Sequence, residues 1–430
     1  MKKRPLFAEV RNFFLYDVYS PEGNVNENIF AYSNRLADDK ALVVFNNRFE
    51  QASGWIKTSV GYRQNNEIRQ SSLIDGLNLS HQEGTFVIFR DHASGMEFIR
   101  SNREIAENGI MVALDGYKYN VFLEFREVHP SRLRPYDRLA RELNGRGTES
   151  IEEAVLIMSL APIHRLVTAF LSSDHLIPSP AELHDEKEAL AFEHSIGLLL
   201  EGVAQQFSEL MEKPVDLPET LAAQASALYR RVDALAELLP SQPDSRKLQT
   251  ALGLSSQSKA DYFTISRHWI VLVTLQRMVE ATVVESSNII DNWLMQRALS
   301  SIYPEKGITG IPGDNLPDML CCMLSHKPEL IPDDPEARLH ALLNGLYTVE
   351  KTHLGRMLQF DERHQKIWFR EHRFSVLMAW LTLLELLKVK PVDQETSKTV
   401  IAEWVEANET IDMQAFLAGY EIGELIRINV

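Results

Sequence analysis

Hydrophobic and polar residues alternate over short runs in the first 128 residues, and this is the pattern of β-strands. Two apolar runs, Asn28–Tyr32 and Ala41–Phe45, flank the polar segment Ala37–Lys40, which predicts a β-hairpin. The segment Asn120–Glu127 alternates in the same way, as a strand with one face in a core would. Local pattern therefore indicates a β-rich module at the front of the chain.

Seven short strands are expected in this module, separated by turn residues: Ile29–Ser33, Leu42–Asn46, Ile56–Tyr62, Phe86–Asp91, Met96–Arg100, Met111–Leu114 and Asn120–Glu127. Short strands at such spacing are typical of an antiparallel β-sandwich. We assign residues 25–128 to the sandwich and residues 1–24 to a lead-in or linker.

The hydrophobic period changes to that of helices after Pro130. Ser150–Glu153 has the pattern of a capping box at a helix start, and Pro162 is expected to split or kink the helix that follows. Further helices are expected near 192–210, 221–239, 260–286, 288–302, 335–358, 363–389, 397–407 and 412–427. Residues 129–430 should thus form a large irregular all-α domain, and the predicted fold class is α+β, multidomain.

The charge of the chain is uneven along its length. Its 60 acidic and 44 basic residues give a net charge of −16, which disfavours nucleic acid as a partner. Residues 1–128 carry only −2 of this charge and residues 129–430 carry −14. An acidic helical region is ordinary as a solvated surface, and an acidic docking face is the alternative.

Cysteine usage and hydropathy indicate a compartment. The two cysteines are adjacent, at Cys321 and Cys322, where a disulfide would be strained and a zinc site would lack ligands. A reducing cytoplasm fits this pattern. The basic start of the chain is not followed by an apolar core or a cleavage site, and we expect no signal peptide and no membrane-spanning segment.

Several sequence segments of the β-module resemble a known accessory domain. The hairpin Asn28–Asn46 and the closing run from Leu114 to Phe122 are similar to domain C, the β-sandwich that follows the catalytic barrel of the α-amylase family of glycoside hydrolases. The phrases GNVNENIFAYSNR, GWIKTSV, FRDHASGMEFIRS and GYKYNVFLEFREV resemble a group of large bacterial α-amylase-like proteins with a helical extension after the sandwich. Gln365–Phe369 resembles the end of that extension.

The resemblance implies a part of such a protein without its catalytic barrel. A (β/α)8 barrel needs about 250 residues, and no βα alternation precedes Val25. The family's catalytic residues therefore find no positions here, and we expect no catalytic residue, no cofactor and no metal. The expected partner is a separate barrel subunit or a missing N-terminal catalytic domain, and an α-glucan is the expected ligand.

Aromatic residues of the β-module are the candidates for contact with sugar, because a pyranose ring has an apolar face. We name Trp55, Tyr62 and Phe89 for this role, with core packing as the alternative for each. Trp55 and Tyr62 are seven residues apart, so a regular strand would place them on opposite faces.

Carboxylate and histidine side chains are the candidates for catalytic and metal chemistry. Asp91 and His92 lie in a predicted turn and are expected to organise that loop. Asp361, His364, Glu371 and His372 would lie on one predicted helix, where a salt-bridged surface is favoured over a metal site. His164 follows Pro162 on an apolar helix and is expected to pack in the core.

The sequence therefore predicts a noncatalytic accessory or C-terminal module of an α-amylase-like system, which supports a barrel partner and contacts glucan. Whether the chain itself is an enzyme stays open, since no residue set in it defines a reaction. The alternative is a helical scaffold or regulatory protein that uses a β-sandwich as a binding head.

Overall fold

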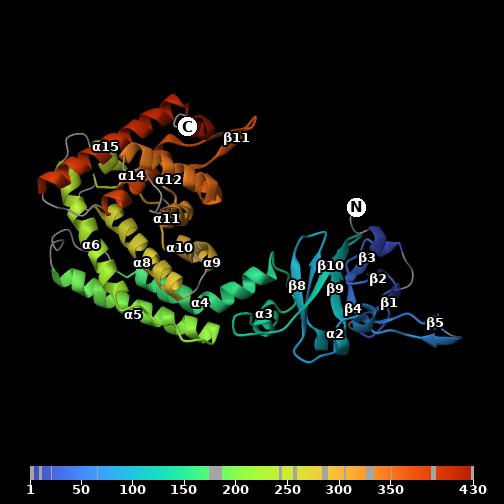
Figure 1. The fold of residues 1–430 in the computed structure, drawn as a ribbon. Helices are drawn as coiled ribbons and strands as arrows, with labels where there is room; N and C mark the ends of the chain where they lie inside the picture. The colour runs from blue at the N-terminus through green and yellow to red at the C-terminus, as the bar shows by residue number, and fades with distance from the viewer. Residues whose placement is uncertain are drawn as a thin grey trace. The chain divides into compact units, whose positions relative to one another are not determined.

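The computed structural model describes residues 4–8, 12–20, 22–64, 66–173, 186–241, 245–254, 259–282, 289–304, 307–325, 334–349, 351–388 and 394–427. The chain divides into two compact units, Met1–Ala161 and Pro162–Val430. The first is built around an antiparallel sheet and the second is largely helical (Figure 1). The predicted α+β class is confirmed.

The N-terminal unit holds one sheet of eight hydrogen-bonded strands in the order β8-β7-β10-β3-β2-β1-β4-β9. The strands are β1 Phe14–Tyr19, β2 Ile29–Leu36, β3 Asp39–Asn46, β4 Ala52–Ser59, β7 Phe86–Asp91, β8 Glu97–Ser101, β9 Ile110–Leu114 and β10 Tyr119–Val128. Side chains from strands near both ends of this order, such as Val87 and Val112, belong to one core. The sheet therefore curls on itself around that core.

The predicted hairpin is present between β2 and β3. Leu36 pairs with Asp39, so only Ala37 and Asp38 lie in the turn, and Ala37 adopts a positive φ of 51°. Positive φ at the first turn residue matches the right-handed twist of the two strands.

Two differences from the predicted boundaries have a physical cause. Strand β1 lies before residue 25, in the expected lead-in, and it pairs with β2 and β4 in the middle of the sheet. Helix α3 (Tyr136–Leu143) and the start of α4 (Ile151–Leu171) bury Ile88 and Ile99 of β7 and β8 in a second core. This burial ties residues beyond 128 to the sheet, so the unit ends at Ala161.

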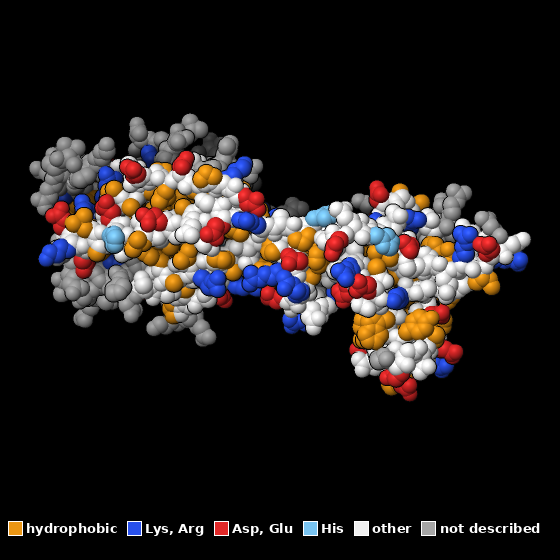
Figure 2. All heavy atoms as spheres, turned by 90° about the horizontal axis from the view of Figure 1, so that it is seen from below, with side chains coloured by type: hydrophobic (Ala, Val, Ile, Leu, Met, Phe, Trp, Pro, Cys, Tyr) orange, Lys and Arg blue, Asp and Glu red, His pale blue; other side chains and the backbone are white. Residues whose placement is uncertain are grey.

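Short elements complete the N-terminal unit. They are the 3-10 turn η1 (Arg4–Phe7), the small hairpin of β5 (Tyr62–Gln64) and β6 (Glu67–Arg69), and the helices α1 (Leu73–Gly76) and α2 (Asn102–Asn108). On the face drawn in Figure 2, acidic and basic side chains both occur, several basic side chains lie in a row, and exposed hydrophobic side chains gather in patches.

The C-terminal unit contains twelve further named helices, the 3-10 turns η3 and η4, and one small hairpin in its described part. The helices are α5 Glu186–Met211, α6 Leu221–Leu238, α7 Arg246–Ala251, α8 Ala260–Thr282, α9 Ile289–Asn292, α10 Gln296–Ser300, α11 Leu316–Leu324, α12 Pro335–Val349, α13 Lys351–Leu358, α14 Glu371–Leu386, α15 Gln394–Leu417 and α16 Ile422–Arg427. The turns are η3 Leu239–Ser241 and η4 Gly313–Asn315. Helix α14 is buried along nearly its whole length.

The helix predicted over 363–389 begins only at Glu371. The preceding residues form a two-stranded hairpin of β11 (Asp361–Arg363) and β12 (Lys366–Trp368). His364 and Gln365 make its turn with φ values of 51° and 65°. Two successive residues of positive φ end any helix, so Asp361 and His364 do not share a helical face.

Helix α4 continues through Pro162 as one helix, so the chain is not split at this proline. It is the one helix, among the residues described, that is long and apolar enough to cross a membrane by composition. Its buried residues Ile151, Val155, Ile163 and Val167 recur at helical spacing. They form the inward stripe that a helix packed in a protein core shows.

Candidate functional site

A cleft of about 1040 Å³ lies within the N-terminal unit. Trp55 stands in its wall on the outward face of β4, because Gly54 and Ile56 on either side of it are buried. Met111 of β9 is paired beside it. The other walls come from β8, from α2, from α3 and from the segment that follows α3, including Arg100, Glu104, Asn108, Arg141, Asn144 and Arg146.

Gly109 fixes the floor of this cleft. It ends α2 with a φ of 80°, and a Cβ atom there would lie 2.2 Å from the backbone oxygen of Ile56. Only glycine allows this approach of the helix end to strand β4. Glu107 and Asn108, which precede Gly109, line the same cleft as Trp55.

The polar groups of the cleft are held by local bonds. Arg100 donates to the backbone oxygens of Ile99 and Gly145, at 2.8 Å each, and its burial lowers the pKa of the guanidinium. Lys57 donates to the backbone oxygen of Glu107. A half-buried indole surrounded by fixed hydrogen-bonding groups is suited to a ligand with an apolar face and polar edges.

The other two aromatic residues named from the sequence do not line the cleft. Tyr62 starts β5, is half-buried, and makes an edge-to-face contact with Phe14 at 5.4 Å between ring centroids. Phe89 is 1% exposed in the core. Contrary to the expectation of a sugar contact, the Phe89 ring packs among Phe98, Phe122 and Phe125.

Asp91 lies at the end of β7 and organises the turn that follows. Its buried carboxylate accepts bonds from the backbone N–H of Ser94 (3.1 Å) and Val121 (3.1 Å), and from the side chains of Ser94 (2.7 Å) and Asn120 (3.0 Å). Burial favours the neutral acid, but these bonds outweigh it and lower the pKa of Asp91. His92 is exposed, and its backbone N–H donates to Val121.

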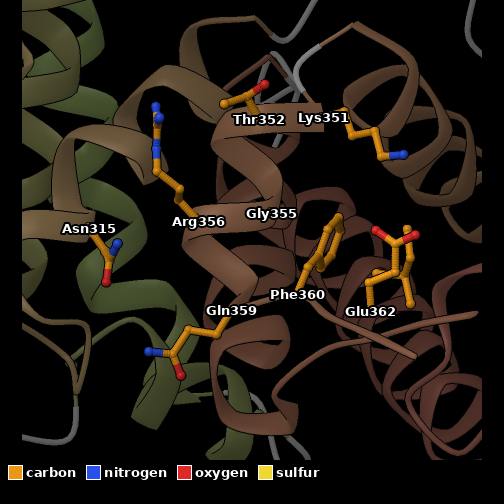
Figure 3. A pocket seen from close by; sticks show the side chains of 9 residues that line it. Asn315, Lys351, Thr352, Gly355, Arg356, Gln359, Phe360 and Glu362 are labelled. Atoms are coloured by element: carbon orange, nitrogen blue, oxygen red, sulfur yellow. The ribbon is translucent and has the colours of Figure 1, made fainter. Parts of the chain in front are cut away.

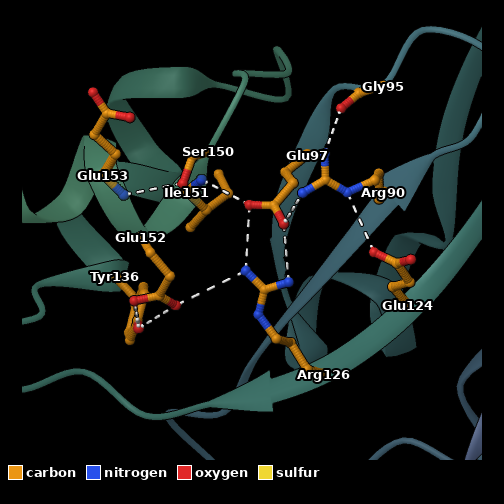
Figure 4. A network of polar contacts seen from close by, with 10 residues as sticks. All are labelled: Arg90, Gly95, Glu97, Glu124, Arg126, Tyr136, Ser150, Ile151, Glu152 and Glu153. Atoms are coloured by element: carbon orange, nitrogen blue, oxygen red, sulfur yellow. Dashed lines mark hydrogen bonds and ion pairs between the residues drawn. The ribbon is translucent and has the colours of Figure 1, made fainter. Parts of the chain in front are cut away.

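A network that the sequence did not reveal is centred on Glu97 (Figure 4). The carboxylate is buried and accepts from Arg90 at 2.9 Å, from Arg126 at 3.0 Å and from the backbone N–H of Ile151 at 2.8 Å. Burial alone would raise the pKa of Glu97, but the bonds from Arg126 and Ile151 lower it. The network ties the first residue of α4 to β8 and β10.

The C-terminal unit holds a second polar centre, around His353 of α13. The imidazole Nδ1 lies 2.8 Å from Asp318 Oδ1, and Nε2 lies 2.9 Å from both carboxylate oxygens of Asp291. Burial opposes protonation of His353, but the bonds to the two carboxylates raise its pKa to about 9. Arg356 Nε donates to Asp318 Oδ1 at 2.9 Å.

Arg356 also lines a pocket of about 620 Å³ together with Lys351, Phe360 and Glu362 (Figure 3). In Figure 3 its side chain points away from Phe360, toward the side of α13 where Asn315 lies. The Arg356 side chain is 43% exposed. It therefore connects the solvent-open pocket with the buried carboxylate of Asp318.

The histidines singled out from the sequence lie elsewhere. His164 is buried and bonded to the backbone oxygen of Trp293 at 2.6 Å, as a packed core histidine. His364 is exposed in the β11–β12 turn, and His372 bonds the backbone oxygen of Thr309 at 3.1 Å. His353 was missed because its partners lie 35 and 62 residues away along the chain.

Comparisons with known proteins found no matching family model, no matching curated protein and no matching solved structure.

Proposed function

We propose that the protein is a noncatalytic accessory module of a carbohydrate-active, α-amylase-like system, and that its N-terminal unit binds an α-glucan in the Trp55 cleft. The observation that carries this proposal is the position of Trp55, half-buried in the wall of a large cleft with guanidinium and amide groups around it. The cleft is large enough for a short oligosaccharide.

Chemistry of the cleft supports binding without hydrolysis. Glycoside hydrolysis needs two carboxyl groups that face each other across the scissile bond. Among the three carboxylates that line the cleft, Asp137 and Glu107 instead bond arginines of their own helices, Arg141 at 3.1 Å and Arg103 at 2.8 Å. The third, Glu104, interacts with the charge of Arg100. We therefore propose that catalysis belongs to a barrel partner, as a separate subunit or as a further domain.

Exposed aromatic side chains offer a surface for such a partner. Phe30, Phe45 and Tyr119 lie on neighbouring strands in direct register, and they are 40%, 36% and 58% exposed. Phe30 and Phe45 stack at 5.1 Å between ring centroids. An exposed aromatic cluster of this kind is typical of a protein contact.

A cytoplasmic location is proposed on the state of the cysteines. Cys321 and Cys322 are both buried as thiols in α11. A protein that keeps its cysteines reduced fits a reducing compartment.

The test is titration of the full chain with a soluble maltooligosaccharide while tryptophan fluorescence is followed. A single stacking aromatic gives weak affinity, with a Kd of about 1 mM. We expect saturable quenching for the native chain and at least tenfold weaker binding for Trp55→Ala. Trp368→Phe, at the half-buried tryptophan of the β11–β12 hairpin, is the control and should bind as the native chain does.

An unchanged titration in Trp55→Ala would remove the cleft as the binding site. Absence of any spectral change at about 10 mM sugar, tenfold above the expected Kd, would remove glucan binding altogether. Release of reducing sugar that survives repurification and disappears with Glu104→Gln would replace the noncatalytic proposal by an enzymatic one.

A helical scaffold remains the second candidate function, favoured by one feature of α15. Met413, Phe416 and Leu417 are 56%, 62% and 72% exposed near its C-terminal end. Apolar side chains in such a group are suited to a protein partner. A partner that binds the full chain and is lost with Phe416→Asp, while glucan binding is absent, would favour the scaffold.

A further inference from the structure

Three side chains with different donor atoms converge in the C-terminal unit, apart from the Trp55 cleft. They are Asp291 of α9, Cys321 of α11 and His353 of α13. A carboxylate oxygen, the thiol sulfur and an imidazole nitrogen of these residues all lie within 4.8 Å of one another. The three residues are far apart in sequence, so the packing of three helices creates the group.

Asp318 orients the imidazole of this group. Its Oδ1 lies 2.8 Å from His353 Nδ1, which places the other ring nitrogen, Nε2, toward Asp291. A carboxylate behind a histidine in this manner is the usual support of a metal-binding imidazole, since it fixes the tautomer and the ring orientation. Asp318 is itself held by Arg356 Nε at 2.9 Å, and Arg356 Nη2 also lies 2.9 Å from His353 Nδ1.

A second observation indicates that the centre is incomplete as it stands. Asp318 is 1% exposed, yet its Oδ2 atom receives no hydrogen bond from any residue in the described part of the chain. Burial of an unsatisfied carboxylate oxygen is costly. A Zn²⁺ ion on Nε2 would draw charge from the ring, strengthen the bond from Nδ1–H to the Asp318 carboxylate, and so offset part of that cost.

We propose that Asp291, Cys321 and His353 bind a Zn²⁺ ion, with Asp318 as the positioning residue behind His353. Nitrogen, sulfur and carboxylate ligands together favour zinc over magnesium or calcium. An aspartate and a thiolate balance the double charge of the ion, and the Asp318–Arg356 pair is neutral by itself. Three protein ligands leave the fourth tetrahedral position to water.

The geometry leaves room for the ion after a small movement. Ligand atoms around tetrahedral zinc lie about 3.4 Å apart, whereas His353 Nε2 and the Asp291 carboxylate are now 2.9 Å apart. Asp291 is 50% exposed and sits on the four-residue helix α9, so its carboxylate can move outward. The same exposed side chain gives the ion a route from solvent.

The test uses the full chain, freed of metal by a chelator and then titrated with Zn²⁺ and, separately, with Co²⁺. We expect one ion per chain, a higher Tm with Zn²⁺, and a sulfur-to-cobalt charge-transfer absorption band with Co²⁺. The adjacent cysteines supply a matched pair of variants. Cys321→Ala should lose the band, and Cys322→Ala should keep it.

Asp291→Asn is the second variant, chosen because a half-exposed position tolerates the change. It should weaken Zn²⁺ binding at least tenfold, and Asp318→Asn should weaken it by about 10- to 100-fold. Asp314→Asn, at an exposed position near α11, should bind as the native chain does. Stoichiometric uptake that is equal in the native chain and in Asp291→Asn, or a cobalt band that survives Cys321→Ala, would overturn the proposal, as would no uptake at all.

Discussion

The two units differ in how completely their buried carboxylates are hydrogen-bonded. In the N-terminal unit, both oxygens of Glu97 accept hydrogen bonds, from two arginines and from the backbone of Ile151. In the C-terminal unit, Asp318 leaves one buried oxygen without a bond from any described residue, and its neighbour Asp291 is half-exposed.

The difference separates scaffold from site. A buried carboxylate whose lone pairs are all satisfied rigidifies the elements that it joins and has no capacity left for a ligand. The His353 centre has a buried Asp318 oxygen that no described residue bonds and, in Asp291, a half-exposed carboxylate that an ion can reach. Glu97 therefore has a structural role in the unit that holds the Trp55 cleft. The His353 centre, in contrast, still has the capacity to bind an ion.

The largest effect is expected from Glu97→Gln. The change leaves Arg90 and Arg126 without their common carboxylate and weakens the tie to α4. Removing one partner of a buried ion pair costs about 4 kcal/mol of unfolding free energy. Denaturant-dependent hydrogen exchange of β7 and β10 measures this cost within the full chain.

Glu124→Gln is the matched control, because Glu124 bonds the same Arg90 from a surface position that is 56% exposed. An exposed pair contributes less than about 1 kcal/mol. Equal losses in the two variants would contradict the contrast between buried and exposed partners of Arg90.

His268 provides the corresponding test in the C-terminal unit. Its two ring nitrogens face Tyr303 Oη at 2.9 Å and the backbone oxygen of Leu171 at 3.2 Å, and Arg267 lies next to it. Burial lowers the pKa of His268 to about 4, with a further lowering by the charge of Arg267. The folded unit therefore holds this imidazole neutral.

As the pH falls below about 6.5, the unfolded chain protonates His268 first. Stability should therefore decrease between pH 6.5 and pH 4, by up to about 3 kcal/mol, and the contribution should level off below that range. His268→Gln should flatten this slope in fluorescence-monitored unfolding, while His92→Gln, at an exposed position, should leave it unchanged. A slope that is the same in native chain and His268→Gln would refute the assignment.

Asp91→Asn is expected to have a smaller effect, of about 2 kcal/mol. The amide cannot accept all the bonds that the carboxylate receives from Ser94, Asn120 and Val121. Asp38→Asn, in the exposed turn of the β2–β3 hairpin, should change the unfolding free energy by less than about 0.5 kcal/mol. Hydrogen exchange at the β7–β8 turn distinguishes the two, and a neutral Asp91→Asn would mean that the turn forms without its carboxylate.

The sequence predicted those elements that are determined by residues close together along the chain. The β2–β3 hairpin follows from alternation and a polar turn, and the start of α4 follows from the Ser150 cap, whose hydroxyl accepts from the Glu153 N–H at 3.2 Å. A helix was predicted from residue 363, but residues 361–368 form a β-hairpin. The prediction was wrong because His364 and Gln365 adopt positive φ without being glycine.

Sites were less predictable because they are made by contacts between distant residues. Trp55 could be named from its strand, but the cleft in front of it depends on α3, more than 80 residues later. The His353 centre joins residues from three helices, and no spacing motif marks it. Strand periodicity also could not place Phe89, since both faces of a curled sheet carry buried side chains.

The smallest change in unfolding free energy is expected from Asp291→Asn in the presence of a chelator. This variant is also the sharpest test of the difference between the Glu97 network and the His353 centre. A half-exposed carboxylate bonded to His353 contributes less than about 1 kcal/mol, because solvent screens the pair and Asp318 still holds the ring. Unfolding of the metal-free C-terminal unit, followed by fluorescence of its tryptophans, should thus barely change. A loss as large as that of Glu97→Gln would show that the His353 centre is a completed structural network like the one around Glu97, and the distinction between a closed scaffold and an open site would fail.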